Sequence, residues 1–122
     1  MTLLTYLRAD LAKLMKRRDK VALNAVRDAI SAIENAETSY VSTPATVGAP
    51  NEFVAGTVRF GHAERVVTEL TAQQMMALAR EQVELRLTEA ANYRAAGRVD
   101  QALTLKAEAL GLADRLDAFA AE

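Results

Sequence analysis

Four segments of the chain repeat mostly apolar side chains at steps of three or four residues. Only an α-helix turns this spacing into one continuous face. The segments span residues 3–17, 20–39, 72–96 and 101–119. Between the second and third, prolines and glycines interrupt the pattern throughout residues 40–68. The sequence therefore predicts an all-α fold with a long, irregular central linker.

Each segment has its own apolar stripe, which it cannot bury alone. The predicted stripes are Leu4, Leu7, Leu11 and Leu14; Leu23, Val26, Ile30 and Ile33, with Glu37 next at the same spacing; Met76, Ala79, Val83, Leu87, Ala90 and Tyr93; and Leu105, Ala109, Leu112, Leu116 and Phe119. Alanine, the strongest helix former, occurs 25 times. We expect the stripes to pack together as a small four-helix arrangement in a single domain, 1–122. Dimerisation through the same stripes is the alternative.

The predicted helices begin after residues that commonly cap helix N-termini. These residues are Thr2, Asp19, Thr71 and Asp100. Gln74 follows Thr71 at the spacing of a capping box, and Gly97 is placed to end the third helix in a left-handed conformation. Because the helix–helix connections are short, 1–39 and 69–119 should each form an antiparallel αα-hairpin. Within the linker, Phe53–Val54 and Val58–Phe60 flank a turn and predict a small β-like hairpin.

Composition excludes several classes of function. The chain has no Cys and one His, which excludes disulfides, thiol catalysis and a multi-histidine metal centre. We interpret His62, alone in the linker, as a solvent-exposed loop residue. No apolar run is long enough for a membrane span, and Arg8 and Asp10 come too early for a signal sequence, so a cytoplasmic location is expected. No catalytic residues, metal, cofactor, membrane or small-molecule substrate are predicted.

Basic residues concentrate at the first helix–helix connection. Residues 1–30 have seven positive and three negative side chains, although the net charge of the chain is −1. The candidate anion or RNA contacts are Lys13, Lys16, Arg17, Arg18, Lys20 and Arg27. Lys and Arg side chains bind phosphates by displacing counterions. The alternative is a solvated helix end whose cations complement the helix dipole. No aromatic residue is interleaved, so stacking on single-stranded bases is not indicated.

A second group, Arg86, Tyr93 and Arg98, has either a recognition or a structural role. Tyr93 falls on the apolar stripe, and Arg98 is placed to bond carbonyls at a helix end. The carboxylates of the second hairpin are expected to be solvated or ion-paired at the surface. They are Glu81, Glu84, Glu89, Glu108, Asp114 and Asp117.

The order of several short motifs resembles the GatB/YqeY family over roughly two-thirds of the chain. The matching residues are Leu7-Arg8-Ala9-Asp10-Leu11, Met15-Lys16, Arg18-Asp19-Lys20, Arg27, Ser31-Ala32-Ile33, Asn35-Ala36-Glu37, Leu70-Thr71, Arg86, Tyr93, Ala96-Gly97-Arg98, Asp100, Ala102 and Ala107-Glu108. The resemblance implies an all-helical fold and kinship with the tail domain of the tRNA-dependent amidotransferase B subunit, which contacts tRNA. The chain departs from the family pattern in its longer linker, and the match ends near Leu116, before a second helical domain that members commonly have.

Three functional hypotheses follow. The first, implied by the resemblance, is a non-catalytic accessory module linked to tRNA or RNA metabolism, supporting carbon–nitrogen ligation with glutamine as amido-N-donor in trans. The second is a protein–protein adaptor, with a groove between the hairpins and no nucleic-acid role. The third, independent catalysis, is disfavoured because the sequence lacks Cys, a Ser-Lys amidase signature and a phosphate-binding loop.

Overall fold

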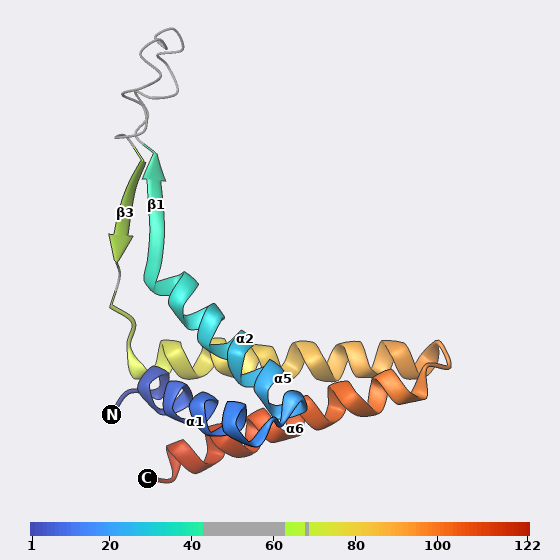
Figure 1. The fold of residues 1–122 in the computed structure, drawn as a ribbon. Helices are drawn as coiled ribbons and strands as arrows, with labels where there is room; N and C mark the ends of the chain where they lie inside the picture. The colour runs from blue at the N-terminus through green and yellow to red at the C-terminus, as the bar shows by residue number, and fades with distance from the viewer. Residues whose placement is uncertain (43–62, 68) are drawn as a thin grey trace, which may run out of the picture. The chain divides into compact units, whose positions relative to one another are not determined.

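A computed structural model describes residues 1–42, 63–67 and 69–122 (Figure 1). The elements in chain order are α1 (Leu3–Arg17), α2 (Lys20–Glu37), β1 (Thr38–Ser42), β3 (Ala63–Val67), α5 (Ala72–Ala95) and α6 (Val99–Ala120). Two compact units are present, the first comprising 1–33 and 71–122 and the second 34–70. The predicted all-α arrangement of four helices is confirmed, with helix ends within two residues of those expected.

Side chains fix the starts of the first three helices as predicted. Thr2 and Asp19 each accept a hydrogen bond from the backbone N–H three residues later, at 3.1 and 3.2 Å. Thr71 and Gln74 cap each other: the Gln74 N–H donates to Thr71 Oγ1 at 3.1 Å, and the Thr71 N–H donates to Gln74 Oε1 at 2.8 Å. These bonds satisfy backbone donors that a helix leaves without intrahelical partners.

The turn between α5 and α6 is a Schellman motif centred on Gly97, which has a φ of +82°. The Arg98 N–H donates to the Tyr93 carbonyl at 2.8 Å, and the Gly97 N–H donates to the Arg94 carbonyl at 3.0 Å. Helix α6 begins directly after this turn, and its N-cap, Arg98, makes no side-chain capping bond. The prediction that Asp100 caps α6 was therefore wrong. Asp100 lies in the first turn, where its carboxylate complements the helix dipole.

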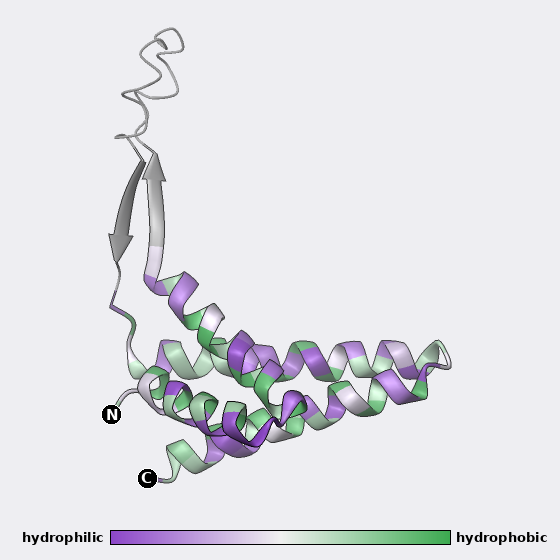
Figure 2. Ribbon diagram, in the orientation of Figure 1, coloured by the Kyte–Doolittle hydropathy of each residue, from purple (hydrophilic) through white to green (hydrophobic). Residues whose placement is uncertain are grey.

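The core of the first unit is made by side chains from all four helices. Its largest fully buried side chains are Leu7, Leu14, Val26, Ile33, Leu112 and Leu116. Apolar and polar residues are interspersed along each helix (Figure 2), and α1 and α2 separate them onto two faces more clearly than α5 does. The predicted stripe of α2 needs correction, because Leu23 and Glu37 are only half-buried. The α2 core face instead includes three alanines, Ala22, Ala25 and Ala29, whose small side chains weaken the sequence signal.

The two hairpins of the first unit differ in how closely their helices pack. Helices α5 and α6 run antiparallel against each other, whereas α1 and α2 diverge from their shared turn (Figure 1). Helix α1 contacts the second hairpin, where the rings of Tyr6 and Phe119 lie 5.1 Å apart, tilted by 56°. The first hairpin therefore obtains its core largely from α5 and α6.

The second unit contains a two-stranded antiparallel sheet. Strands β1 and β3 pair in a register that runs from Thr38 opposite Val67 to Ser42 opposite Ala63. The two ends of the linker are thus strands and not irregular chain. The β-like hairpin predicted near 53–60 and His62 lie outside the described residues.

Candidate functional site

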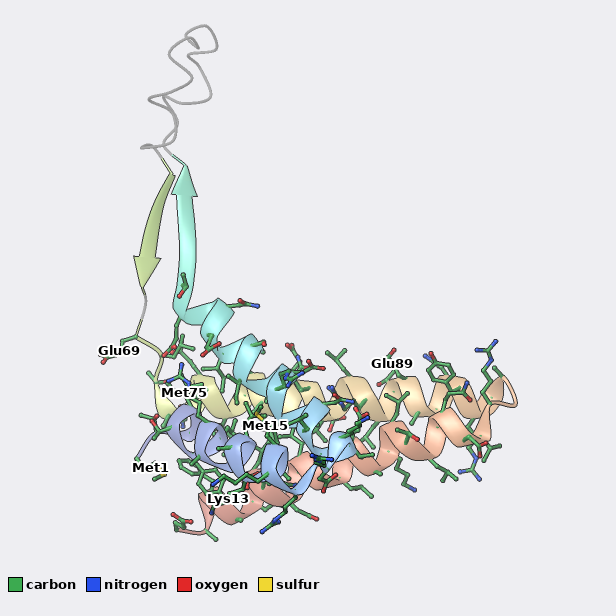
Figure 3. All side chains as sticks on the ribbon, viewed as in Figure 1. Met1, Lys13, Met15, Glu69, Met75 and Glu89 are labelled. Carbon is green, nitrogen blue, oxygen red and sulfur yellow. The ribbon has the colours of Figure 1, made fainter. Side chains whose placement is uncertain are left out.

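The predicted anion contacts gather around the connection between α1 and α2, and we call them the basic turn. They are Lys13, Lys16, Arg17, Arg18, Lys20 and Arg27, and each is exposed. Within the described part of the chain, none of the six has an ion-pair or side-chain hydrogen-bond partner. Figure 3 marks Lys13 on α1. A phosphate group can therefore approach these cations without breaking an existing ion pair.

The backbone between the helices brings these cations to one end of the hairpin. Lys16 and Arg17 occupy the last turn of α1. Arg18 reverses the chain with a φ of +59°, and Lys20 opens α2. Arg27 lies seven residues beyond Lys20, which places it on the same face of α2, about 10 Å further along the axis. Two helices thus contribute positive charge around their shared turn.

The three acidic residues within 1–30 each have a partner in the protein. Asp10 pairs with Arg115 of α6, and Asp28 pairs with Arg86 of α5. Asp19 accepts the capping hydrogen bond at the start of α2. The charges of Asp10 and Asp28 are thus compensated by arginines outside the basic turn, and Asp19 is the one acid that remains within it, so the net charge there is positive.

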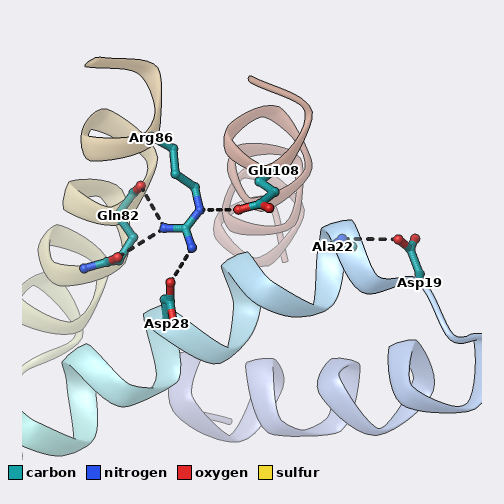
Figure 4. A network of polar contacts seen from close by, with 6 residues as sticks. All are labelled: Asp19, Ala22, Asp28, Gln82, Arg86 and Glu108. Atoms are coloured by element: carbon teal, nitrogen blue, oxygen red, sulfur yellow. Dashed lines mark hydrogen bonds and ion pairs between the residues drawn. The ribbon is translucent and has the colours of Figure 1, made fainter. Parts of the chain in front are cut away.

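Arg86 lies at the centre of a buried polar network that joins three helices (Figure 4). Only 7% of Arg86 is exposed. Its Nε donates to Glu108 Oε1 at 2.9 Å, its Nη1 donates to Gln82 Oε1 at 3.2 Å, and its Nη2 donates to Asp28. Glu108 is also buried, so its predicted surface position was wrong. The guanidinium supplies the partner that a buried carboxylate requires.

Burial lowers the pKa of Arg86, but the hydrogen bonds and charges of Asp28 and Glu108 more than offset this, so its pKa lies above the ordinary value. A raised pKa means that the charged form contributes stability below the ordinary arginine pKa, and hence throughout the usual pH range. One sequence signal pointed to this role. Arg86 falls between Val83 and Ala90 at steps of three and four, on the buried stripe of α5.

Two further ion pairs connect the helices of the first unit. Arg115 pairs with Asp10 of α1, and its Nη1 donates to the Gly111 carbonyl at 3.0 Å. Arg80 and Asp117 join α5 to α6 at 2.6 Å, in a more exposed position. The first hairpin is therefore held to the second by two arginines, Arg86 and Arg115, that bind carboxylates of α2 and α1.

The predicted group of Arg86, Tyr93 and Arg98 does not form one site. Tyr93 is half-buried and Arg98 is exposed, and both line a shallow hollow near the α5–α6 turn. A neighbouring hollow of about 400 Å³ includes Tyr93, Glu89 and Asp100. Figure 3 marks Glu89 on α5. Arg86 lies about two turns from Tyr93 along α5, inside the buried network.

No protein-family model matches the chain, and neither a curated protein nor a solved structure matches it at a significant level. No helix in the described residues is both long and apolar enough to cross a bilayer. The same residues contain no cluster of three or more His, Cys, Asp or Glu side chains arranged to hold a metal ion.

Proposed function

We propose that this chain is a non-catalytic helical module that binds RNA through the basic turn. The observation that supports this is the charge pattern there: six exposed cations without partners among the described residues, beside three acids that are already engaged. The resemblance to the GatB/YqeY family makes tRNA the expected class of RNA. It also makes support of glutamine-dependent carbon–nitrogen ligation in trans, in the cytoplasm, the expected setting.

Counterion release is the physical basis of this binding. Each phosphate that a cation neutralises releases condensed counterions, so affinity falls as salt concentration rises. Six contacts predict a slope of log K against log salt of about −4 to −5.5. The basic turn contains no aromatic side chain, which favours contact with the phosphate backbone of a folded RNA over stacking with single-stranded bases.

The test is fluorescence anisotropy with labelled bulk tRNA, at about 50 mM and about 200 mM salt. A triple Ala variant of Lys16, Arg17 and Lys20 is compared with a matched triple Ala variant of Arg94, Arg98 and Lys106. The second set is also exposed, but it lies at the far end of the second hairpin. We expect the Lys16, Arg17 and Lys20 variant to weaken binding by at least about tenfold. Its slope of log K against log salt should be less steep by the contribution of about three phosphate contacts.

Equal losses in the two variants would contradict the assignment of the site, because they would show diffuse attraction to any positive charge. Absence of tRNA binding at low salt would contradict the proposed function itself. Circular dichroism of each variant, compared with the parent chain, separates loss of binding from loss of fold.

A further inference from the structure

A second surface lies at the end of the α5–α6 hairpin, which we call the hairpin tip (residues 87–106). From Ala91 to Gln101 every residue is exposed except Tyr93, which is half-buried. Within the first unit, Figure 1 shows α5 and α6 continuing past α1 and α2. Apolar side chains are nevertheless present at the tip: Val99 is 53% exposed and Leu103 is 58% exposed. Val99 and Leu103 lie one helical turn apart on α6, and a group of exposed apolar side chains indicates an interaction surface.

These side chains line a groove of about 250 Å³ between the two helices. Alanines make its floor, since Ala90 and Ala102 are 8% and 6% exposed. A larger side chain at either position would fill the space, so the hollow follows from the small residues. Leu87 of α5 and Leu103 of α6 stand on opposite walls. The groove is thus shaped to receive an apolar side chain from outside.

The apolar surface continues along α6 as a stripe. Val99, Leu103 and Leu110 are all exposed and lie with Lys106 at steps of four, three and four residues, which places them on one helical face. These residues span about 16 Å of the helix axis, or three turns. That length fits the i, i+3, i+4 and i+7 anchors by which a partner helix binds a groove.

The charges that line the groove distinguish between two occupants, a second copy of this chain and a partner protein. Arg94 and Lys106 also line it, and no acidic residue does. Neither cation has an ion-pair partner within the described part of the chain. A symmetric dimer through the groove would bring the cations of both copies into one interface with no acidic residue of the groove to pair with them, which is unfavourable. A partner with acidic flanks would instead match the groove in charge.

We propose that the groove at the hairpin tip binds an acidic amphipathic helix of a partner protein. The apolar face of that helix inserts between Leu87 and Leu103, and its carboxylates pair with Arg94 and Lys106. This differs from the groove between the hairpins that the adaptor hypothesis expected. It also shares no residue with the basic turn, so the two proposals can fail separately.

The test uses a fluorescent synthetic peptide of about 18 residues, with Leu at i, i+3, i+4 and i+7 and Glu at most other positions. Anisotropy gives the Kd, and amide chemical shifts of the labelled protein locate the contact. We expect saturable binding, with shifts concentrated in residues 87–106. Leu103→Asp and the double variant Arg94→Glu/Lys106→Glu should each weaken binding by at least about tenfold, as loss of an anchor at an interface does.

Leu85→Asp is the matched control. Leu85 is the same residue type, is 49% exposed, and lies on the opposite side of α5 from Leu87 and Arg94 by helical periodicity. This variant should bind the peptide like the parent chain. Ala91→Trp should block the groove without removing any cation, and the triple Ala variant of the basic turn should retain peptide binding.

Three results would overturn the proposal. The first is an equal loss of binding in Leu85→Asp and Leu103→Asp, which would indicate a non-specific apolar contact. The second is equally tight binding of a peptide with the same leucines but Lys in place of Glu. The third is a concentration-dependent dimer, seen by light scattering and dissociated by Leu103→Asp, which would make a second copy the occupant.

Discussion

Two residues, Arg18 and Gly97, reverse the chain with the same backbone motif but at different cost. Both have positive φ, +59° for Arg18 and +82° for Gly97. At the first turn the Asp19 N–H donates to the Leu14 carbonyl at 3.1 Å. This bond corresponds to the one from the Arg98 N–H to the Tyr93 carbonyl at the second turn. Glycine adopts this conformation freely, whereas any side chain is strained there. The first turn therefore stores backbone strain that the second avoids.

Gly97→Ala should lower the free energy of unfolding by about 1 kcal/mol. Apart from Gly97 and its two neighbours in the chain, no residue comes within 4 Å of the position that a Cβ would take, so the expected loss comes from the backbone and not from a clash. Urea denaturation followed by circular dichroism measures it. An unchanged midpoint would mean that the turn relaxes to negative φ at no cost.

Arg18→Gly should be more stable than Arg18→Ala by about 0.5–1 kcal/mol. Both variants remove the same charge, so the difference between them isolates the left-handed backbone. Equal unfolding midpoints would contradict the strained turn. Both variants should weaken tRNA binding to the same extent, because the basic turn acts through its charge.

Among the elements, α2, α5 and α6 depend on the buried guanidinium of Arg86. Arg86→Met should lower the free energy of unfolding by about 3–5 kcal/mol, because it leaves the Glu108 carboxylate buried without its partner. The double variant Arg86→Met/Glu108→Leu should recover most of that loss, since two apolar side chains leave no buried charge. Denaturant unfolding of Arg86→Met, Glu108→Leu and the double variant gives the coupling free energy between the two side chains.

Asp28→Asn is the comparison within the same network. Asp28 also pairs with Arg86, but 55% of its side chain is exposed, so this change should cost less than about 1 kcal/mol. A large loss on Asp28→Asn, or no recovery in the double variant, would show that the network is not organised around the Arg86–Glu108 pair.

Features of the helix ends that depend on neighbouring residues could be predicted from the sequence. The caps at Thr2, Asp19 and Thr71 and the glycine turn at Gly97 were all confirmed because each acts over three or four residues. The prediction for Asp100 was wrong because α6 already begins at Val99, so Arg98 occupies the N-cap position and Asp100 lies inside the first turn.

Long-range partners were missed by the same reasoning. The strands β1 and β3 are separated by 20 residues, and Arg86 meets Glu108 across 22 positions and Asp28 across 58. The predicted stripe of α5 omitted Arg86, although its spacing from Val83 and Ala90 fits the buried face, and no local pattern identifies the carboxylates that pair with it. The six cations of the basic turn are exposed, as the sequence predicted. The groove at the hairpin tip was not predicted, because it depends on alanines from two different helices and no local sequence pattern indicates it.

At the scale of the whole molecule, the first unit is assembled from 1–33 and 71–122, and the segment 34–70 forms a separate compact unit. Thr38 and Val67 are paired residues in the antiparallel register, so their Cα atoms lie about 5 Å apart. A flexible Gly/Ser linker of about four residues spans that distance. Replacing residues 39–66 with such a linker should therefore leave the first unit folded.

The shortened chain is expected to keep the helical circular dichroism signal per molecule and a Tm within about 4 °C of the parent. Leu112→Ala, which opens a cavity at a fully buried position, should lower stability by about 2–5 kcal/mol in both the full and the shortened chain. Equal losses would show that the core does not depend on 39–66, because distant, uncoupled changes add. An unfolded shortened chain, or a much smaller Leu112→Ala effect in it, would show that this segment helps to build the core.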